Sequence, residues 1–390
     1  MKKIVLKKSG EDKINYFRQW IYYNEINKIP KGIKSGEIVE IFSQNGKFLG
    51  IGYINPLSKI SLRVLSFFKR INIDDFIKKR IKNAIYRRKG LERITNAYRV
   101  VHSEADFLPG LIVDKYDKYI SFQINTAGME NFRDKIIDSL VEIFLPKGVY
   151  DKSDRKIRKI EGLDTKNKVV YGIVPENLVI VENEVKFSVY LKEGQKTGFY
   201  LDQRKNRKII SEYVKSGDKI LDLFSNSGGF GIYAGKRGSE YIKFVDISEN
   251  ALNQVEYNCK INQIKNYAIV KKDVFDFLKK EIATGRTYNL IIIDPPSFAK
   301  TKHEKEGALR GFKYLLINGL KLLEKDGYLA VFSCSYHVDL EDLMNVLMQA
   351  ARDTQNLIEI LEILKQDKDH PIAANMPESF YLKGLLVRKL

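Results

Sequence analysis

Four polar side chains in the C-terminal half each stand near the end of an apolar run of strand type. They are Asp222, Asp246, Asp294 and Cys334, in runs that begin at residues 219, 241, 290 and 328. The carboxyl ends of parallel strands meet at one edge of a doubly wound α/β sheet, where such sheets bind ligands. An acid at such an edge can hold ribose hydroxyls. The four strand ends therefore predict a single ligand crevice.

The first of these runs leads into a loop of small residues, Ser225-Asn226-Ser227-Gly228-Gly229, and the residues from Phe230 are typical of a helix. Gly228 and Gly229 allow a ligand to approach the backbone closely, with the helix N-terminus behind it. Taken alone, the loop also fits a tight strand–helix connection without a ligand. The three further strand ends favour the ligand site.

The N-terminal half has a different organisation, with short strands and turns over residues 1–68. An Asn45-Gly46 pair between two apolar runs indicates a β-hairpin. Residues 74–89 have apolar positions at helical spacing with basic residues between them, and strand-like segments follow. We expect three domains: a small β-barrel over residues 1–68, an α+β domain over 69–187, and a doubly wound, mostly parallel α/β domain over 188–390.

The composition points to a polyanionic partner. The 390 residues have a formal net charge of +18. No apolar run reaches the length of a membrane span, and the basic N-terminus lacks the apolar core of a signal peptide. The two cysteines fit a reducing cytosol, so we expect a cytoplasmic protein. With four histidines besides, little is left for a metal site, and none is predicted.

Two groups of basic residues are candidate RNA contacts. Lys78, Arg87 and Arg88 belong to the predicted helix at 74–89, which would carry a cationic face. Arg204 and Arg207 lie in the first turns of a helix that follows Asp202. Cations are unfavourable at that end of the helix dipole, so an RNA phosphate or an internal carboxylate must favour them there.

Five motifs in order carry a resemblance to a known family. They are Asp-Leu-Phe-Ser-Asn-Ser-Gly-Gly-Phe at 222–230, Val-Asp-Ile-Ser at 245–248, Lys-Asp-Val-Phe at 272–275, Asp-Pro-Pro-Ser-Phe-Ala-Lys at 294–300 and Phe-Ser-Cys-Ser at 332–335. Together they resemble the class I S-adenosylmethionine-dependent methyltransferases. More narrowly, the whole chain resembles the bacterial ribosomal RNA large-subunit cytosine-5 methyltransferases. The resemblance implies a PUA-like barrel, a middle α+β domain and a Rossmann-like methyltransferase domain.

The resemblance also implies a cofactor site. The loop from Asp222 would hold the methionine part of S-adenosylmethionine, Asp246 the ribose, and the residues around 247 and 273 the adenine. The implied cofactor residues are Asp222, Phe224, Ser227, Gly228, Gly229, Asp246, Ile247, Asp273, Val274, Asp294 and Pro295. Asn226 departs from the family pattern, which has an aromatic residue there.

The same resemblance gives Cys334 a role. Carbon 5 of cytosine is a poor nucleophile until a thiolate adds to carbon 6, which makes the ring an enamine. Cys334 would be that nucleophile, and Asp294 would stabilise the ring at its N3 edge. Ser297 stands where some RNA cytosine-5 enzymes have a second cysteine, so the base that removes the C5 proton is not identified. Cys259 lies in a helical pattern and is interpreted as a packing residue.

Three other functions remain as alternatives. Asp-Pro-Pro at a strand end also resembles the motif that orients an exocyclic amine, and an amine methyltransferase needs no thiol. Residues 229–231 faintly resemble a dinucleotide fingerprint, which would suit a dehydrogenase. An RNA-binding or ribosome-assembly factor with a degenerate catalytic domain is the third. Ribosomal RNA, of the large subunit, is the expected partner, with no membrane and a homodimer left open.

Overall fold

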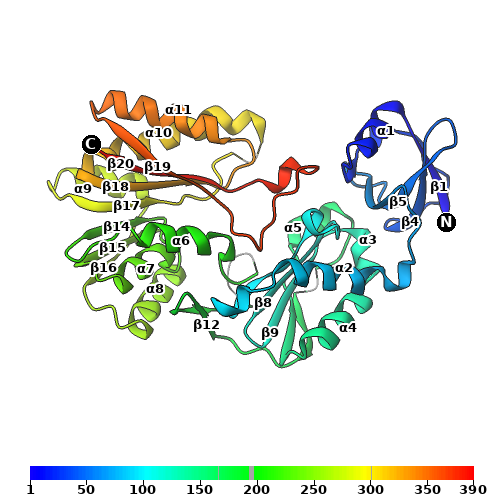
Figure 1. The fold of residues 1–390 in the computed structure, drawn as a ribbon, viewed down its shortest axis with the longest axis horizontal. Coiled ribbons are helices and arrows are strands. Elements are labelled where there is room, and N and C mark those ends of the chain that lie inside the picture. Colours follow the sequence, from blue (N-terminus) through cyan, green and yellow to red (C-terminus); the bar gives the residue numbers. More distant parts are fainter. Residues whose placement is uncertain (166, 193–196, 300) are drawn as a thin grey trace. The chain divides into compact units, whose positions relative to one another are not determined.

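The computed structural model describes residues 1–390 apart from 166, 193–196 and 300, and it forms two compact units (Figure 1). One unit comprises Met1–Ile180, Val189–Leu201 and Lys368–Ser379, and the other comprises Val181–Ser188, Asp202–Asp367 and Phe380–Leu390. A segment late in the sequence, Lys368–Ser379, thus belongs to the first unit. Lys300, the last residue of the Asp-Pro-Pro motif, lies outside the described residues.

The first unit begins with a six-stranded sheet in the order β2-β6-β5-β4-β1-β3. Its elements are β1 (Lys2–Leu6), α1 (Lys8–Asn15), β2 (Trp20–Ile21), η1 (Tyr23–Glu25), β3 (Ile26–Lys28), β4 (Glu37–Phe42), β5 (Phe48–Ile54) and β6 (Leu62–Phe67). The predicted hairpin is confirmed, because β4 and β5 pair antiparallel and Gly46 at their turn has a φ of 77°. Inward residues such as Ile4, Val39 and Leu62 form a buried core of their own.

A second, five-stranded sheet follows in the same unit, in the order β11-β10-β9-β8-β7. Its elements are α2 (Ile73–Arg87), η2 (Leu91–Arg93), β7 (Ala97–His102), η3 (Ser103–Asp106), β8 (Leu111–Tyr116), β9 (Tyr119–Ile124), α3 (Ala127–Glu130), α4 (Arg133–Phe144), β10 (Gly148–Asp151), α5 (Arg155–Ile160) and β11 (Lys168–Gly172). The helices α2 and α4 pack on this sheet through residues such as Ile77, Ile81 and Ile136. A two-stranded sheet, β12 (Leu178–Glu182) with β13 (Val185–Val189), comes next.

The second unit contains a seven-stranded sheet in the order β16-β15-β14-β17-β18-β20-β19. Its elements are η4 (Leu201–Gln203, which begins in the first unit), α6 (Arg204–Ser211), β14 (Lys219–Leu223), α7 (Gly229–Lys236), β15 (Tyr241–Asp246), α8 (Glu249–Ile261), β16 (Tyr267–Lys271), α9 (Val274–Ile282), β17 (Tyr288–Ile293), η5 (Lys302–Glu304), α10 (Lys305–Leu322), β18 (Leu323–Ser333), α11 (Leu340–Asp353), β19 (Ile358–Lys365) and β20 (Lys383–Lys389). The first five strands in this order run parallel, and β20 is antiparallel to both of its neighbours. The order reverses between β14 and β17, and the carboxyl ends of the strands at such a reversal are where sheets of this type bind ligands.

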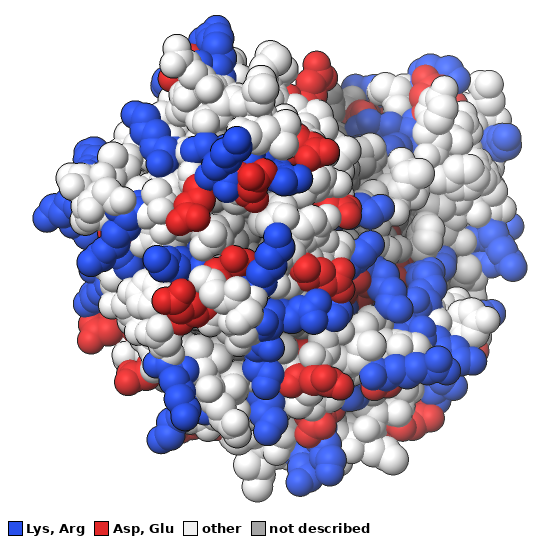
Figure 2. Space-filling view, turned by 60° about the vertical axis from the view of Figure 1, so that its left-hand side comes forward, with Lys and Arg blue, Asp and Glu red and all other residues white. Residues whose placement is uncertain are grey.

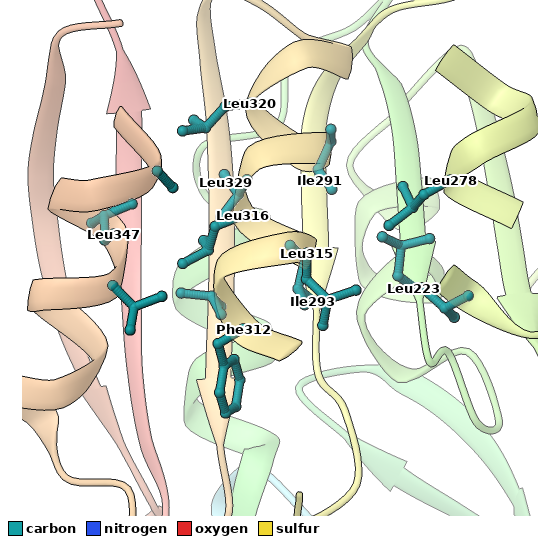
Figure 3. Close-up of a cluster of buried hydrophobic side chains, with 14 of the residues drawn as sticks. Leu223, Leu278, Ile291, Ile293, Phe312, Leu315, Leu316, Leu320, Leu329 and Leu347 are labelled. Carbon is teal, nitrogen blue, oxygen red and sulfur yellow. The ribbon is translucent and has the colours of Figure 1, made fainter. Parts of the chain in front are cut away.

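Helices cover both faces of this sheet. In Figure 1, α9, α10 and α11 lie on one side of it, and α6, α7 and α8 on the other. The buried cluster under α10 includes Leu223, Ile293, Phe312 and Leu329 (Figure 3). Since these strands are covered on both faces, they read as continuous apolar runs rather than as alternating patterns. The predicted fold class, a class I methyltransferase sheet preceded by a PUA-like domain and α+β structure, is confirmed.

The predicted domain limits at 68/69 and 187/188 stay a prediction. In the described part of the chain, no helix is long and apolar enough to cross a membrane. The short helix η6 (Pro377–Ser379) belongs to the Lys368–Ser379 segment of the first unit.

Candidate active site

Asp222 is the most deeply buried acid at the edge of the seven-stranded sheet. Its side chain is almost without exposure, and its Oδ2 accepts the backbone N–H of Gly231 at 2.9 Å. Burial raises the pKa of Asp222 well above its usual range. The Gly231 hydrogen bond opposes this rise, whereas the charges of Asp294 and Asp246 add to it. Asp294 and Asp246 therefore lie close enough to Asp222 for their charges to affect it.

The loop after β14 is held in an unusual backbone conformation. Phe224, Asn226 and Gly228 all have positive φ, of 57°, 47° and 81°. This winding turns the Asn226 N–H toward β15, where it donates to Asp246 Oδ2 at 2.9 Å. Asn226 thus contributes through its backbone, so its departure from the family's aromatic residue leaves this contact unchanged.

Asp246 joins two loops. Its Oδ1 accepts the N–H of Ser248 at 2.9 Å, in addition to the bond from Asn226. Each carboxylate oxygen has a second lone pair, so Asp246 can still accept from a ligand hydroxyl. Ile247 beside it is 67% exposed, so its side chain is open to a ligand ring.

Gly231 was missed as a functional position by the sequence reasoning. A Cβ on Gly231 would lie 2.3 Å from Cε1 of Phe244, so only glycine lets α7 approach β15 closely enough. That approach brings the Gly231 N–H to Asp222. The spacing of Gly229 and Gly231 could have indicated this close approach, but it was interpreted only as a faint dinucleotide fingerprint.

The predicted adenine residues have local structural roles as well. Asp273 is the N-cap of α9 and accepts the N–H groups of Phe275 and Asp276 at 2.9 and 3.2 Å. Val274 is buried beneath it. Lys272 N–H bonds Asp246 O, so the end of β16 is tied to the end of β15. Any contact of Asp273 with adenine would use a lone pair that the cap leaves free.

Cys334 and Asp294 lie at neighbouring strand ends. Ile293 pairs with Val331 between β17 and β18, which brings the residues that follow to the same edge. Cys334 Sγ is 3.9 Å from the carbonyl oxygen of Pro295, directly after Asp294. The side chain of Asp294 accepts from Gln203 Nε2 at 3.1 Å.

The two cysteines have different environments. Cys259 is fully buried in α8, and burial raises the pKa of its thiol to about 12. Cys334 is only partly buried. Of the two thiols, Cys334 is therefore the more accessible, and its role as the nucleophile stays a prediction.

The structure corrects the interpretation of Arg204 and Arg207. Arg204 is 1% exposed and pairs with Asp367 at 2.7 Å, and Arg207 is 2% exposed. Arg207 makes two bonds to Glu182, of 2.6 and 2.9 Å. Of the two explanations for cations at this helix end, the structure shows the internal carboxylate for both arginines.

Of the basic residues predicted at α2, Arg88 is corrected in the same way. Arg88 is 1% exposed and binds Asp106 through two hydrogen bonds, of 2.7 and 2.6 Å. Arg87 also pairs with Asp106, although its side chain is partly exposed. Lys78 pairs with Glu142 at 2.7 Å. Arg88 is therefore a structural residue, whereas the partly exposed Lys78 and Arg87 stay predicted RNA contacts.

The crevice has the donors and acceptors that S-adenosylmethionine requires. Asp222 and Asp246 offer carboxylates to its ammonium group and its ribose hydroxyls. Ser225 lies in the loop between them, and its buried Oγ has no hydrogen-bond partner among the described residues. An unsatisfied buried hydroxyl is costly unless a ligand satisfies it. The residues present therefore fit the cofactor.

Comparison with known proteins agrees with this fit. Residues 4–67 match the model of a PUA-like domain, and residues 162–366 match that of an S-adenosylmethionine-dependent methyltransferase. A ribosomal RNA large subunit methyltransferase I of Tolumonas auensis is 38% identical over 99% of both chains. The chain belongs to the ribosomal RNA large subunit methyltransferase I family. The family's protein from Aeromonas salmonicida is 38% identical as well, over 99% of this chain and 98% of that protein.

Solved structures share the fold of this family member over its full length. A methyltransferase in complex with SAH superposes with a TM-score of 0.86 at 23% identity and full coverage of both chains. An S-adenosylmethionine-dependent methyltransferase from Streptococcus mutans gives a TM-score of 0.85 at 22% identity, again with full coverage. This member of the family is thus an S-adenosylmethionine-dependent methyltransferase with an N-terminal PUA-like domain.

Proposed function

We propose that this methyltransferase forms 5-methylcytosine in large-subunit ribosomal RNA, with Cys334 as the nucleophile. The supporting observation is the position of the thiol. Cys334 is partly open and lies 3.9 Å from the Pro295 carbonyl, at the strand end next to Asp294. The named relatives are ribosomal RNA large subunit methyltransferases, which supports the substrate class.

The cofactor supplies an electrophilic methyl group when it is bound. Asp222, Ser225 and the loop of Ser227, Gly228 and Gly229, with Phe224 at its start, would hold the methionine end. Asp246 would hold the ribose hydroxyls. Ile247, Val274 and Asp273 would border the adenine, and Asp294 and Pro295 would lie beside the methyl group and the target base.

The chain's residues then perform the covalent steps. The Cys334 thiolate forms a bond to carbon 6 of cytosine, and the electron pair of the C5–C6 double bond becomes available at carbon 5. Asp294, in its protonated form, would donate to N3 as negative charge develops there. Once carbon 5 is methylated, a base removes its proton. The C5–C6 double bond then re-forms, and the thiolate leaves.

An exocyclic-amine methyltransferase is the second candidate, because Asp-Pro-Pro could orient an amine. Such an enzyme has no use for a thiol. The position of Cys334 at the same edge as Asp294 favours the cytosine-5 reaction.

Trapping with 5-fluorocytidine RNA tests the proposal. Fluorine cannot leave carbon 5 as a proton does, so the Cys334 adduct should persist through denaturing electrophoresis and require S-adenosylmethionine. Cys334→Ser should lose both adduct and turnover, while Cys259→Ser, the matched control, should keep both. Normal methylation by the Cys334 variant, or an adduct on Cys259, would reject the cytosine-5 assignment in favour of the amine reaction.

For the RNA surface we propose the exposed face of α2 that carries Lys79, Lys82 and Tyr86, together with Lys89 just beyond the end of the helix. Figure 2 shows basic and acidic side chains intermingled on the face that it presents, so charge alone does not locate a path for RNA. Lys79, Lys82 and Lys89 are exposed, and no ion pair joins them to a carboxylate within the described ranges. Tyr86 lies among them and is 76% exposed. Cations flanking an open aromatic ring suit phosphates and an unpaired base.

A charge-matched comparison tests this surface. Replacing Lys79, Lys82 and Lys89 by Gln should lower RNA affinity and reduce the slope of log affinity against log salt by about 2–3. The control replaces three lysines that pair with carboxylates, namely Lys78, Lys279 and Lys313. Equal losses in the two triple variants would mean that only net charge matters, and would reject the surface.

A further inference from the structure

Lys383 is a buried cation without a carboxylate partner. It begins β20, is 3% exposed, and no ion pair links it to an acid in the part of the chain that the structure describes. Its Nζ donates to the carbonyl oxygen of Ser335 at 2.8 Å and lies 5.5 Å from the centre of the Phe380 ring. An ammonium group is costly to bury unless it is paired, so its retention here requires an explanation.

Lys383 lies beside the turn that carries Cys334. Lys383 pairs directly with Ser333 across the β18–β20 ladder, one residue before Cys334. The carbonyl that it binds belongs to Ser335, one residue after Cys334. Ser335 is fixed further by its Oγ, which donates to Ala299 O at 2.5 Å. The ammonium group therefore touches the turn on which the thiol is mounted.

The acids nearest to Lys383 are engaged elsewhere. Asp342 in α11 pairs with Lys305 at 2.7 Å, and Asp339 caps α11 through the Asp342 N–H at 2.8 Å. On the other side, Lys365 of β19 pairs with Lys383 across the ladder and adds a like charge. Burial lowers the pKa of Lys383, while the charges of Asp339, Cys334 and Asp342, in that order, oppose the fall.

We propose that the Lys383 ammonium group is the counter-ion of the Cys334 thiolate and fixes the turn that carries it. This inference rests on the proposed function, because a thiolate is needed only if Cys334 is the nucleophile. Lys383 makes and breaks no bond in the reaction. The proton leaves Cys334 for solvent, and the negative charge that remains is held beside a cation already stripped of water. Lys383 is thus a positioning residue.

The pH dependence of thiol alkylation tests this without RNA or cofactor. Iodoacetamide reacts with the thiolate, so the rate at the Cys334 peptide, followed by mass spectrometry, reports the thiol pKa. In the unmodified chain its midpoint should fall below the ordinary value of about 8.5. Buried Cys259 serves as the unreactive reference in the same sample. A wild-type midpoint at or above about 8.5 overturns the proposal, with no variant required.

Variants separate a charge effect from a folding effect. Lys383→Met and Lys383→Gln should raise the Cys334 midpoint by about one unit, which makes alkylation at pH 7 about tenfold slower, and Lys383→Arg should restore it. The control is Lys389→Met on the same strand, where Nζ instead bonds the carbonyls of Leu320 and Leu323. An unchanged midpoint in folded Lys383→Gln, or an equal shift in Lys389→Met, overturns the assignment. If no 5-fluorocytidine adduct forms but the Lys383 variants still shift the Cys334 midpoint, the cytosine reaction is rejected while the role of Lys383 stands.

Discussion

Replacing Arg207 tests whether the basic residues of α6 are structural. Arg207 and Glu182 are 2% and 0% exposed and are joined by two hydrogen bonds. Glu182 raises the pKa of Arg207 against the desolvation that lowers it. The substitution Arg207→Met removes the guanidinium group but keeps much of the side-chain volume. It leaves a buried carboxylate without its cation.

The expected cost follows from that burial. Removing one partner of a buried ion pair costs about 3–5 kcal/mol, since the other charge is stranded. For a unit of about 150–250 residues, 1 kcal/mol corresponds to a shift of about 2–4 °C in the unfolding temperature. We therefore expect a fall of roughly 6–20 °C. The double variant Arg207→Met, Glu182→Met buries no charge and should recover most of the loss.

Calorimetry of the full chain measures the shift, and RNA affinity is measured well below the transition. The structural role predicts a lower unfolding temperature, recovery in the double variant, and wild-type RNA affinity in both. The reasoning is refuted if Arg207→Met unfolds at the wild-type temperature and yet binds RNA weakly. That result would return Arg207 to the RNA-binding surface.

Three further outcomes are expected. The pKa of Asp222 is raised in the free protein, and an ionised carboxylate suits the cationic cofactor. Cofactor binding should therefore release a proton at pH values below that raised pKa, and cofactor affinity should fall as the pH falls. Titration calorimetry in buffers of different ionisation enthalpy measures this proton release, which Asp222→Asn should abolish. Asp246→Ala should weaken S-adenosylmethionine binding by roughly 1.5–3 kcal/mol, with RNA affinity unchanged. An unaltered cofactor affinity would mean that Asp246 only joins the loops of Asn226 and Ser248. Gly231→Ala should lower stability by about 1–3 kcal/mol because its Cβ meets Phe244, whereas Gly307→Ala, whose Cβ would lie 3.8 Å from the flexible side chain of Arg310, should not.

The fold and the crevice could be predicted because their signals are local. A strand buried on both faces is a continuous apolar run, and the residue that ends it lies at the sheet edge by construction. Asp222, Asp246, Asp294 and Cys334 were chosen as site residues in this way, and their roles stay predictions. The antiparallel position of β20 and the association of Lys368–Ser379 with the first unit depend on pairings between distant segments, which no short window of sequence contains.

The partners of buried cations are equally distant. Arg204 pairs with Asp367, far later in the chain, and Arg207 pairs with Glu182, 25 residues before it. Neither partner lies within the short stretch of sequence around its arginine. The burial of Lys383 could not be predicted from its neighbours in the sequence. The strand β20 is buried along most of its length, so no alternation of buried and exposed residues marks the position of Lys383. A basic residue looks the same in the sequence whether its counter-charge is an RNA phosphate or a carboxylate of the chain.

Helical spacing nevertheless distinguishes the two cases on α2. Ile77, Ile81 and Ala84 are the buried face, and Arg88 continues their pattern four residues after Ala84. A cation on the core face must find an internal carboxylate, and Arg88 finds Asp106. Lys79, Lys82 and Tyr86 recur at the same spacing on the exposed face, and neither lysine forms an ion pair within the described residues. The net charge of +18 thus includes cations that buried carboxylates neutralise, and helix phase separates these from the exposed cations that we propose for RNA.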